Sequence, residues 1–243
     1  MILTDLDGPD WPADEVVDLI CVGTGVAVLA VAIAAEQAGL DVLLTADSGT
    51  VTSLPHGPNL AADAATFLHE VCDDMVEPED PGPQPWIRRA DEPGWPQLRP
   101  GVTFSGAALR NWAGSCLASP YGLVGTEVAG IDAEPIPVAP VPGGGPVDLD
   151  VWLPELAHEH GLTSDGDVLC DLVLAGGRVV GAVVGGDDSP SGRTVVRAVA
   201  GVVFSAGAAV PAGTNPVTDA DVTELVIQPR PFSRFARLQL LAP

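Results

Sequence analysis

The chain has 243 residues, with 33 acidic and 10 basic side chains, so its formal net charge is −23. All ten basic residues are arginine. This balance argues against a nucleic-acid partner, because binding a phosphate backbone requires clustered cations that release counterions. Hydrophobic residues make up 47% of the chain, which excludes a disordered polymer. The length suits one large domain or two small ones.

The cysteines and the N-terminus indicate a cytoplasmic protein. No two of the four cysteines form a CxxC pair, and Cys21 and Cys170 lie in apolar runs where a free thiol packs as a small core residue. We therefore expect a reducing compartment. The N-terminus lacks the basic region of a signal peptide. The apolar stretch over residues 19–35 has acidic flanks, so it predicts a buried strand and helix and no membrane span.

The N-terminal region has the pattern of a β-α-β unit. Residues 16–22 predict a buried strand, residues 23–25 a tight turn, and residues 26–38 a helix that ends before Gly39. Residues 41–45 predict a second apolar strand. Units of this kind build parallel sheets with right-handed crossovers.

The middle of the chain combines predicted helices with segments rich in proline. We expect helices over residues 59–75 and 105–117. Residues 77–100 are acidic and Pro-rich, and residues 131–146 are rich in Pro and Gly, so both predict irregular structure. Together they define an irregular insert over about residues 77–146.

The second half changes from a helix to strands. A short helix is expected over residues 150–160, stopped by Gly161. Strands are then expected over residues 167–175, 178–184, 194–199 and 201–204. Residues 209–243 are poorly patterned, and we interpret them as a C-terminal tail suited to docking on a partner.

The turn after the first strand resembles a dinucleotide fingerprint. In G-x-G-x-x-G, the first glycine makes the turn, the second lets a pyrophosphate approach the backbone, and the third lets helix and strand pack closely. Residues 23–28 read GTGVAV, so Val28 replaces the third glycine and should push the helix away from the strand. The expected ribose-binding acid falls at Ala46, one residue before Asp47. These residues allow either a dinucleotide site or a Rossmann-like unit that no longer binds one.

Two later motifs extend this pattern. The helix LPELAHEHGL leads to a strand, GRVVGAV at residues 177–183 forms the centre of a meander, and SAGA at residues 205–208 ends the last strand. In this order, they resemble the flavoprotein family of fumarate reductase, succinate dehydrogenase and 3-ketosteroid dehydrogenase, in which A-T-G-G takes the place of SAGA. Residues 11–25 are similar to the start of the ketosteroid dehydrogenase branch. The matches cover roughly residues 11–50 and 152–208.

The resemblance implies an α/β fold: a Rossmann-like FAD-binding domain over residues 1–208, with a parallel sheet and a β-meander, lacking the family's substrate cap domain. It implies a set of cofactor-binding residues. Those at the pyrophosphate are Gly23, Thr24, Gly25 and Val26; those near the ribose are Asp47 and Ser48; Val168 meets the adenine through its backbone; and Ser205, Ala206 and Gly207 line the flavin.

The implied function is an FAD-dependent oxidoreductase that transfers a hydride at a carbon next to a carbonyl of a small or steroid-like substrate. Because the cap is missing, a second protein chain would complete the site in an oligomer. The alternative is a non-catalytic, degenerate subunit of the same fold that stabilises a partner enzyme. A third interpretation is a nucleotide-binding module that uses NAD. The resemblance assigns no catalytic residue.

Other chemically capable residues have simpler interpretations. His158 and His160 are two apart and point to different sides of a helix, so we expect no metal site there. Tyr121 is expected to pack or to form a turn. Trp86 and Arg88 lie in the Pro-rich insert, where they suit either loop packing or a partner interface.

Overall fold

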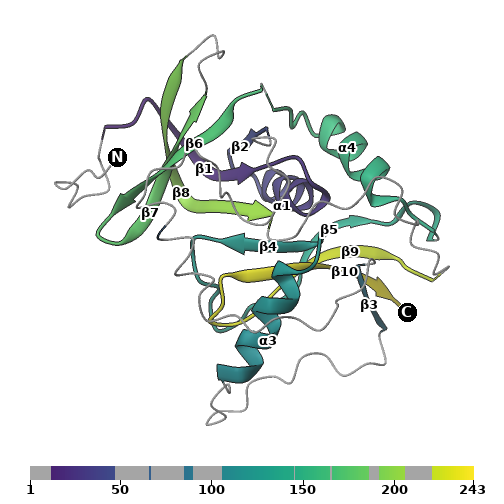
Figure 1. The fold of residues 1–243 in the computed structure, drawn as a ribbon. Coiled ribbons are helices and arrows are strands. Elements are labelled where there is room, and N and C mark those ends of the chain that lie inside the picture. Colours follow the sequence, from purple (N-terminus) through teal and green to yellow (C-terminus); the bar gives the residue numbers. More distant parts are fainter. Residues whose placement is uncertain are drawn as a thin grey trace.

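A computed structural model describes residues 12–46, 66, 85–89, 106–144, 146–164, 166–185, 192–205 and 221–243. Over these residues, the fold is mixed α/β, with one strand-rich, curled sheet that contains parallel and antiparallel strands (Figure 1). Of the helix expected over residues 59–75, only Thr66 is described, and it is helical.

The sheet and its helices have the following bounds. The strands are β1 (Glu15–Val22), β2 (Val42–Thr45), β3 (Trp86–Arg89), β4 (Gly122–Gly125), β5 (Ile136–Pro140), β6 (Val168–Ala175), β7 (Arg178–Gly185), β8 (Arg193–Ser205), β9 (Glu224–Pro229) and β10 (Phe235–Ala242). The helices are α1 (Val26–Gln37), α3 (Gly106–Leu117), α4 (Leu149–Glu159) and the short 3-10 turn η1 (Pro142–Gly144). The main strand order is β2-β1-β8-β4-β10-β9-β5, with β3 beside β10, β7 beside β8 and β6 beside β7.

The predicted β-α-β unit is confirmed by β1, α1 and β2. Strands β1 and β2 pair in parallel from Leu19 opposite Val42 onward. Helix α1 ends as expected before Gly39, whose φ is 79°. The N–H groups of Gly39 and Leu40 donate back to the carbonyls of Glu36 and Ala35, at 2.8 and 3.0 Å. This is the glycine-dependent Schellman stop that the sequence indicated.

The predicted meander is confirmed by β6, β7 and β8, which are consecutive antiparallel neighbours. The strands expected over residues 194–199 and 201–204 are one strand, β8, with an irregularity at Gly201. Gly201 has a φ of 126°, and the pairing of β8 with β1 shifts register between Val17 and Leu19. A single positive-φ glycine lets the strand accommodate the extra residue and continue.

The expectation of a mainly parallel sheet requires correction. Among the described strands, parallel pairing joins β1 to β2, β1 to β8 and β3 to β10, and the remaining strand pairs are antiparallel. Part of the expected insert is regular, because β3, β4 and β5 all lie between residues 77 and 146. Strands β9 and β10, which lie within the expected tail, pair with each other inside the same sheet. Pairing between distant strands, which local patterns do not specify, makes these segments regular.

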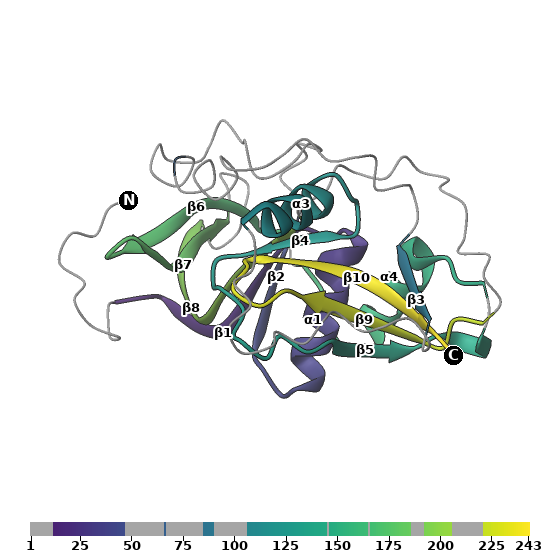
Figure 2. The same ribbon diagram turned by 90° about the horizontal axis from the view of Figure 1, so that it is seen from below.

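The sheet separates two apolar clusters. One contains residues of α1 and α4 together with Leu225, Leu238 and Leu240. The other contains Trp112 of α3 together with Phe204. Figure 2 shows α3 on one face of the β4–β10 region, and α1 and α4 on the other. The alternation of side chains along β10 therefore supplies both clusters.

The apolar stretch over residues 19–35 is divided between β1 and α1, as predicted. Its helical part, α1, has 12 residues. Within the described ranges, the helices lack the length and apolar character needed to cross a bilayer.

Candidate functional site

The carboxyl ends of β1, β2 and β8 meet at one edge of the sheet. Val22 is opposite Thr45 on one side and opposite Phe204 on the other, and both pairings are parallel. The chain therefore leaves β1 with its two parallel neighbours on opposite sides. In open α/β sheets, ligands bind beyond the carboxyl ends of strands at such a switch point.

Gly23 makes the turn that leaves this edge. Its φ of 104° lies in a region that side-chain-bearing residues rarely adopt. Its N–H donates to the carbonyl oxygen of Thr45 at 3.2 Å, which ties the turn to the end of β2. Gly23 is therefore required by the backbone itself.

Gly25 is different, because the protein itself does not require a glycine there. It is the N-cap of α1 with φ −68° and ψ 156°, a conformation open to any residue. A Cβ placed on it would have one neighbouring atom within 4 Å, Oγ of Ser205 at 4.0 Å. The missing side chain leaves space beside the helix end, and this is the space a phosphate group would use.

The N-terminus of α1 is also chemically suited to an anion. Gly25 supplies no side-chain hydrogen bond, and the first turn contains no acidic residue. The first N–H groups of a helix have no intrahelical partner, and the helix dipole is positive at this end. Near the turn, Thr45 is fully buried, and its Oγ1 has no hydrogen-bond partner among the described residues. The edge therefore combines helix donors with a buried hydroxyl group.

A fourth backbone segment reaches the same edge. Val168 forms a parallel bridge with Ala46, just beyond the end of β2. The N–H of Ala46 donates to the carbonyl oxygen of Asp167 at 2.7 Å. The start of β6 thus lies next to β2, on the side away from β1.

The structure brings together five of the residues expected to bind a cofactor: Gly23, Thr24, Gly25, Val26 and Ser205. Val168 lies at the same edge, separated from β1 by the end of β2. Asp47, Ser48, Ala206 and Gly207 lie outside the described residues. Thr45 was not among the site residues expected from the sequence. The one signal in the sequence that could have identified it is its position as a polar residue at the end of an apolar strand.

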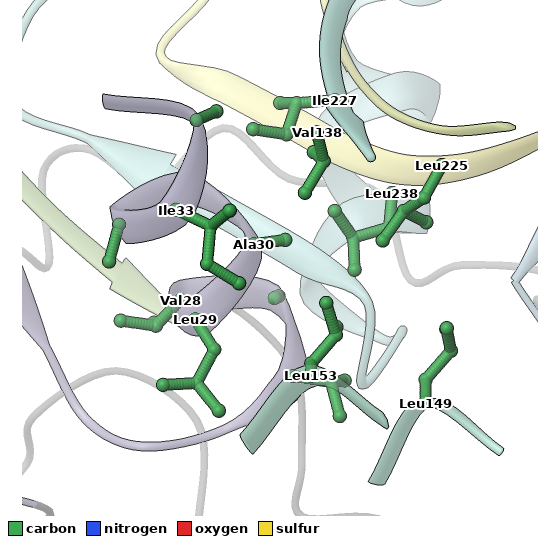
Figure 3. Packing of buried hydrophobic residues seen from close by; sticks show 14 of the residues in the cluster. Val28, Leu29, Ala30, Ile33, Val138, Leu149, Leu153, Leu225, Ile227 and Leu238 are labelled. Atoms are coloured by element: carbon green, nitrogen blue, oxygen red, sulfur yellow. The ribbon is translucent and has the colours of Figure 1, made fainter. Parts of the chain in front are cut away.

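Val28, at the position of the third glycine, is fully buried. It belongs to the cluster that also contains Leu29 and Ile33 of α1, and Leu153 of α4 (Figure 3). The branched side chain is therefore part of the core beneath the turn.

The other candidate residues have structural roles. His160 caps the end of α4, and its Nδ1 lies 2.7 Å from Oε2 of Glu36 in α1. Tyr121 is buried, and burial is the main cause that raises the pKa of its phenol. Cys21 and Cys170 are buried free thiols, as expected.

A comparison of the chain with protein-family models gives no match. A comparison with curated protein sequences gives none either.

Proposed function

We propose that the chain is a flavoprotein-type subunit that binds FAD at the β1–α1 turn. One observation carries the proposal: position 25 is a glycine although its backbone conformation suits any residue. A Cβ would also fit there without overlapping the rest of the protein. The parallel strands β2, β1 and β8, the uncapped end of α1 and the buried Thr45 hydroxyl support it. This is the arrangement that binds a pyrophosphate in dinucleotide-binding folds.

In this proposal, backbone groups carry out most of the binding. The first N–H groups of α1, at Val26 and Ala27, face the pyrophosphate, and the helix dipole compensates for its charge. Ser205 holds the flavin side of the site, and the backbone of Val168 holds the adenine side. FAD, when bound, supplies hydride-transfer chemistry. The substrate would be a small or steroid-like carbonyl compound.

A second candidate is a non-catalytic subunit of the same fold that stabilises a partner enzyme. It is favoured by the described side chains around the turn, because Thr24, Thr45 and Ser205 offer hydroxyl groups and, among the described residues at this edge, no general acid or base. Proton transfer at a carbon next to a carbonyl requires such a group. In either case, a second chain would complete the assembly.

The variant Gly25→Asp tests the binding site separately from the fold. Aspartate is a preferred N-cap residue, and its negative charge is favourable at a helix N-terminus, so the variant should be at least as stable as the parent. The same carboxylate would repel a pyrophosphate. Gly130→Asp is the matched control, because Gly130 has open space around it.

The measurement is isothermal titration with FAD, NAD and ADP, with flavin absorption and thermal unfolding recorded for each variant. We expect FAD to bind the parent and Gly130→Asp, and to lose at least ~tenfold in affinity with Gly25→Asp. If NAD binds tightly and FAD does not bind, the cofactor is a nicotinamide dinucleotide and not a flavin. Equal FAD binding by both variants would contradict the site, and absence of all binding would leave the non-catalytic subunit as the better proposal.

A further inference from the structure

The hairpin of β9 and β10 has one apolar face and one face on which polar side chains lie among apolar ones. Leu225, Ile227, Leu238 and Leu240 belong to the cluster shared with α1 and α4. Because side chains alternate along a strand, the residues between them lie on the face toward α3. This face carries four polar side chains, and we call them together the arginine–glutamine face: Gln228, Arg230, Arg237 and Gln239.

The arginine–glutamine face is buried although all four side chains are polar. Gln239 is 1% exposed, Gln228 3%, Arg237 5% and Arg230 6%. Of the arginines that the structure describes, Arg230 and Arg237 are the buried ones. Full burial is rare for arginine and requires polar or charged compensation.

The pairing of the strands brings these groups together. Arg237 is directly opposite Gln228 across the hairpin, and Gln239 follows two residues further along the same face of β10. The guanidinium carbon of Arg237 lies 5.7 Å from the centre of the Trp86 ring, and that of Arg230 lies 4.6 Å from the centre of the Trp112 ring. Cation–π contacts of this kind hold the guanidinium groups in place, but an aromatic ring does not neutralise a positive charge as an anion does.

Several polar atoms of the face have no hydrogen-bond partner among the residues that the structure describes. The Nε2 of Gln228 donates to the carbonyl oxygen of Pro229 at 2.9 Å, which fixes the amide with its Oε1 pointing elsewhere. This Oε1, the Nε of Arg237 and the Oε1 of Gln239 lack hydrogen-bond partners within the described part of the chain. Arg237 also has no ion pair with a described carboxylate. A buried donor or acceptor left unpaired is costly, by about 1–3 kcal/mol for each group.

The neighbouring thiol does not compensate the arginines. Burial raises the pKa of Cys116 to about 12, so this residue is neutral at physiological pH. Burial also lowers the pKa of Arg237. The face thus contains a buried cation, an unpaired N–H donor and an unpaired carbonyl acceptor.

We propose that the arginine–glutamine face binds a small oxyanion that also carries an O–H group. The anionic oxygen accepts from Nε of Arg237, and the O–H donates to Oε1 of Gln228. Charge-assisted hydrogen bonds to guanidinium are among the strongest in proteins. A hydroxycarboxylate and hydrogen phosphate share this chemistry, whereas a simple carboxylate or sulfate has the charge without the donor near neutral pH.

The position of this site in the sheet is independent of the proposed flavin site but close to it. Leu123 of β4 is opposite Ser205 of β8 on one side and opposite Ala236 of β10 on the other. Two strand spacings, or about 10 Å, therefore separate Ser205 from the backbone next to Arg237. The oxyanion site would exist whether or not FAD binds.

Two matched pairs of anions test the proposal on the full chain by isothermal titration at neutral pH. Glycolate is compared with acetate, and phosphate with sulfate; each pair differs mainly in the O–H group. We expect saturable one-to-one binding of glycolate or phosphate, at least ~tenfold tighter than its partner anion. Binding of glycolate alone identifies a hydroxycarboxylate ligand, and binding of phosphate alone identifies a phosphate group. Absence of saturable binding by all four anions, or equal binding within both pairs, would overturn the proposal.

Two arginine variants distinguish anion binding at this site from a general effect of removing positive charge. Arg237→Gln should weaken binding at least ~tenfold, while Arg178→Gln, which removes an exposed arginine paired with Glu127 at 3.0 Å, should leave it unchanged. If Arg237→Gln fails to fold, Gln228→Leu is the second variant. This variant removes the unpaired Oε1 together with the hydrogen bond that Nε2 donates to Pro229, so it should lose no more than about 1–3 kcal/mol of stability. It should retain binding but lose the preference for glycolate over acetate, and an unchanged preference would contradict the assignment.

Discussion

The Nδ1 atom of His160 lies 2.7 Å from Oε2 of Glu36, so a polar contact joins the C-terminal ends of α4 and α1. The Nε2 atom of the same histidine lies 3.5 Å from Nε2 of Gln37, and apolar packing, in which Leu153 of α4 is fully buried, also joins the helices. Glu36 precedes the glycine stop of α1. The contact therefore aligns α4 with the helix that leads away from the candidate site.

His160→Ala should lower the free energy of unfolding by about 0.5–1 kcal/mol, because a partly exposed polar pair contributes modestly. His158→Ala, two residues earlier on the same helix, is the control and should change stability by less than about 0.5 kcal/mol. Urea unfolding of both variants measures the difference. Equal effects would show that the contact with Glu36 contributes nothing specific.

Gly122→Ala should prevent folding or destabilise the chain by more than ~4 kcal/mol. A Cβ at this position would overlap the backbone carbonyl of Cys116, where the end of α3 passes β4. Backbone atoms cannot move away as a flexible side chain can. Gly130→Ala, where a Cβ has no neighbour within 4 Å, should remain folded. Circular dichroism and soluble yield distinguish the two variants.

Leu153→Ala should lower stability by about 2–5 kcal/mol, since it leaves a cavity between α4 and α1. Its side chain is fully buried, whereas Val151 on the same helix is 54% exposed. Val151→Ala should therefore change the free energy of unfolding by less than about 0.5 kcal/mol. Denaturant unfolding with equal m-values would confirm that both variants report on the same folded state.

Stability should fall as the pH rises above 9. Burial raises the pKa of Cys116 from 9.0 to about 12. Between these values, the folded chain keeps the thiol proton and the unfolded chain loses it, so the stabilisation present below pH 9 is lost. Each such thiol contributes a slope of up to about 1.4 kcal/mol per pH unit, and Cys21 adds a second contribution in the same direction.

The variant Cys116→Ala checks this alkaline slope. It should be less stable at neutral pH because of the lost packing, but its stability should fall less steeply than that of the parent between pH 9 and 10. Parallel stability curves for parent and variant would refute the role of Cys116.

Local patterns in the sequence were sufficient to predict the β-α-β unit and the meander. Each of the signals used lies within a few residues: the apolar run before Gly23, the helix stop at Gly39, and the turn at Gly176 and Gly177. The glycines of that turn have φ values of 56° and 76°. Strand partners are set by contacts far apart in the chain, so local patterns did not reveal β3, β4 or β5. The same limit explains why a mostly parallel sheet was expected.

The buried polar face was missed for a different reason. In Phe235–Ala242, Arg237 and Gln239 alternate with leucines, a pattern that normally places polar side chains in solvent. Burial of these two residues depends on α3 and β3, which the strand's own sequence does not specify. Thr45 was missed because a single hydroxyl at a strand end carries little information without its surroundings.

Strand β4 has four residues and lies between β8 and β10 in the main strand order. Along that order, it is the connection between the parallel strands β1 and β8, which lead to Gly25 and end at Ser205, and the antiparallel hairpin that carries Arg237. A change in twist at β4 would alter the distance between the two candidate sites while leaving each one internally intact. In mechanical terms, β4 and the apolar cluster that α1 shares with Leu225, Leu238 and Leu240 are the two links between the candidate sites, so coupling between their ligands would pass through this strand and this packing.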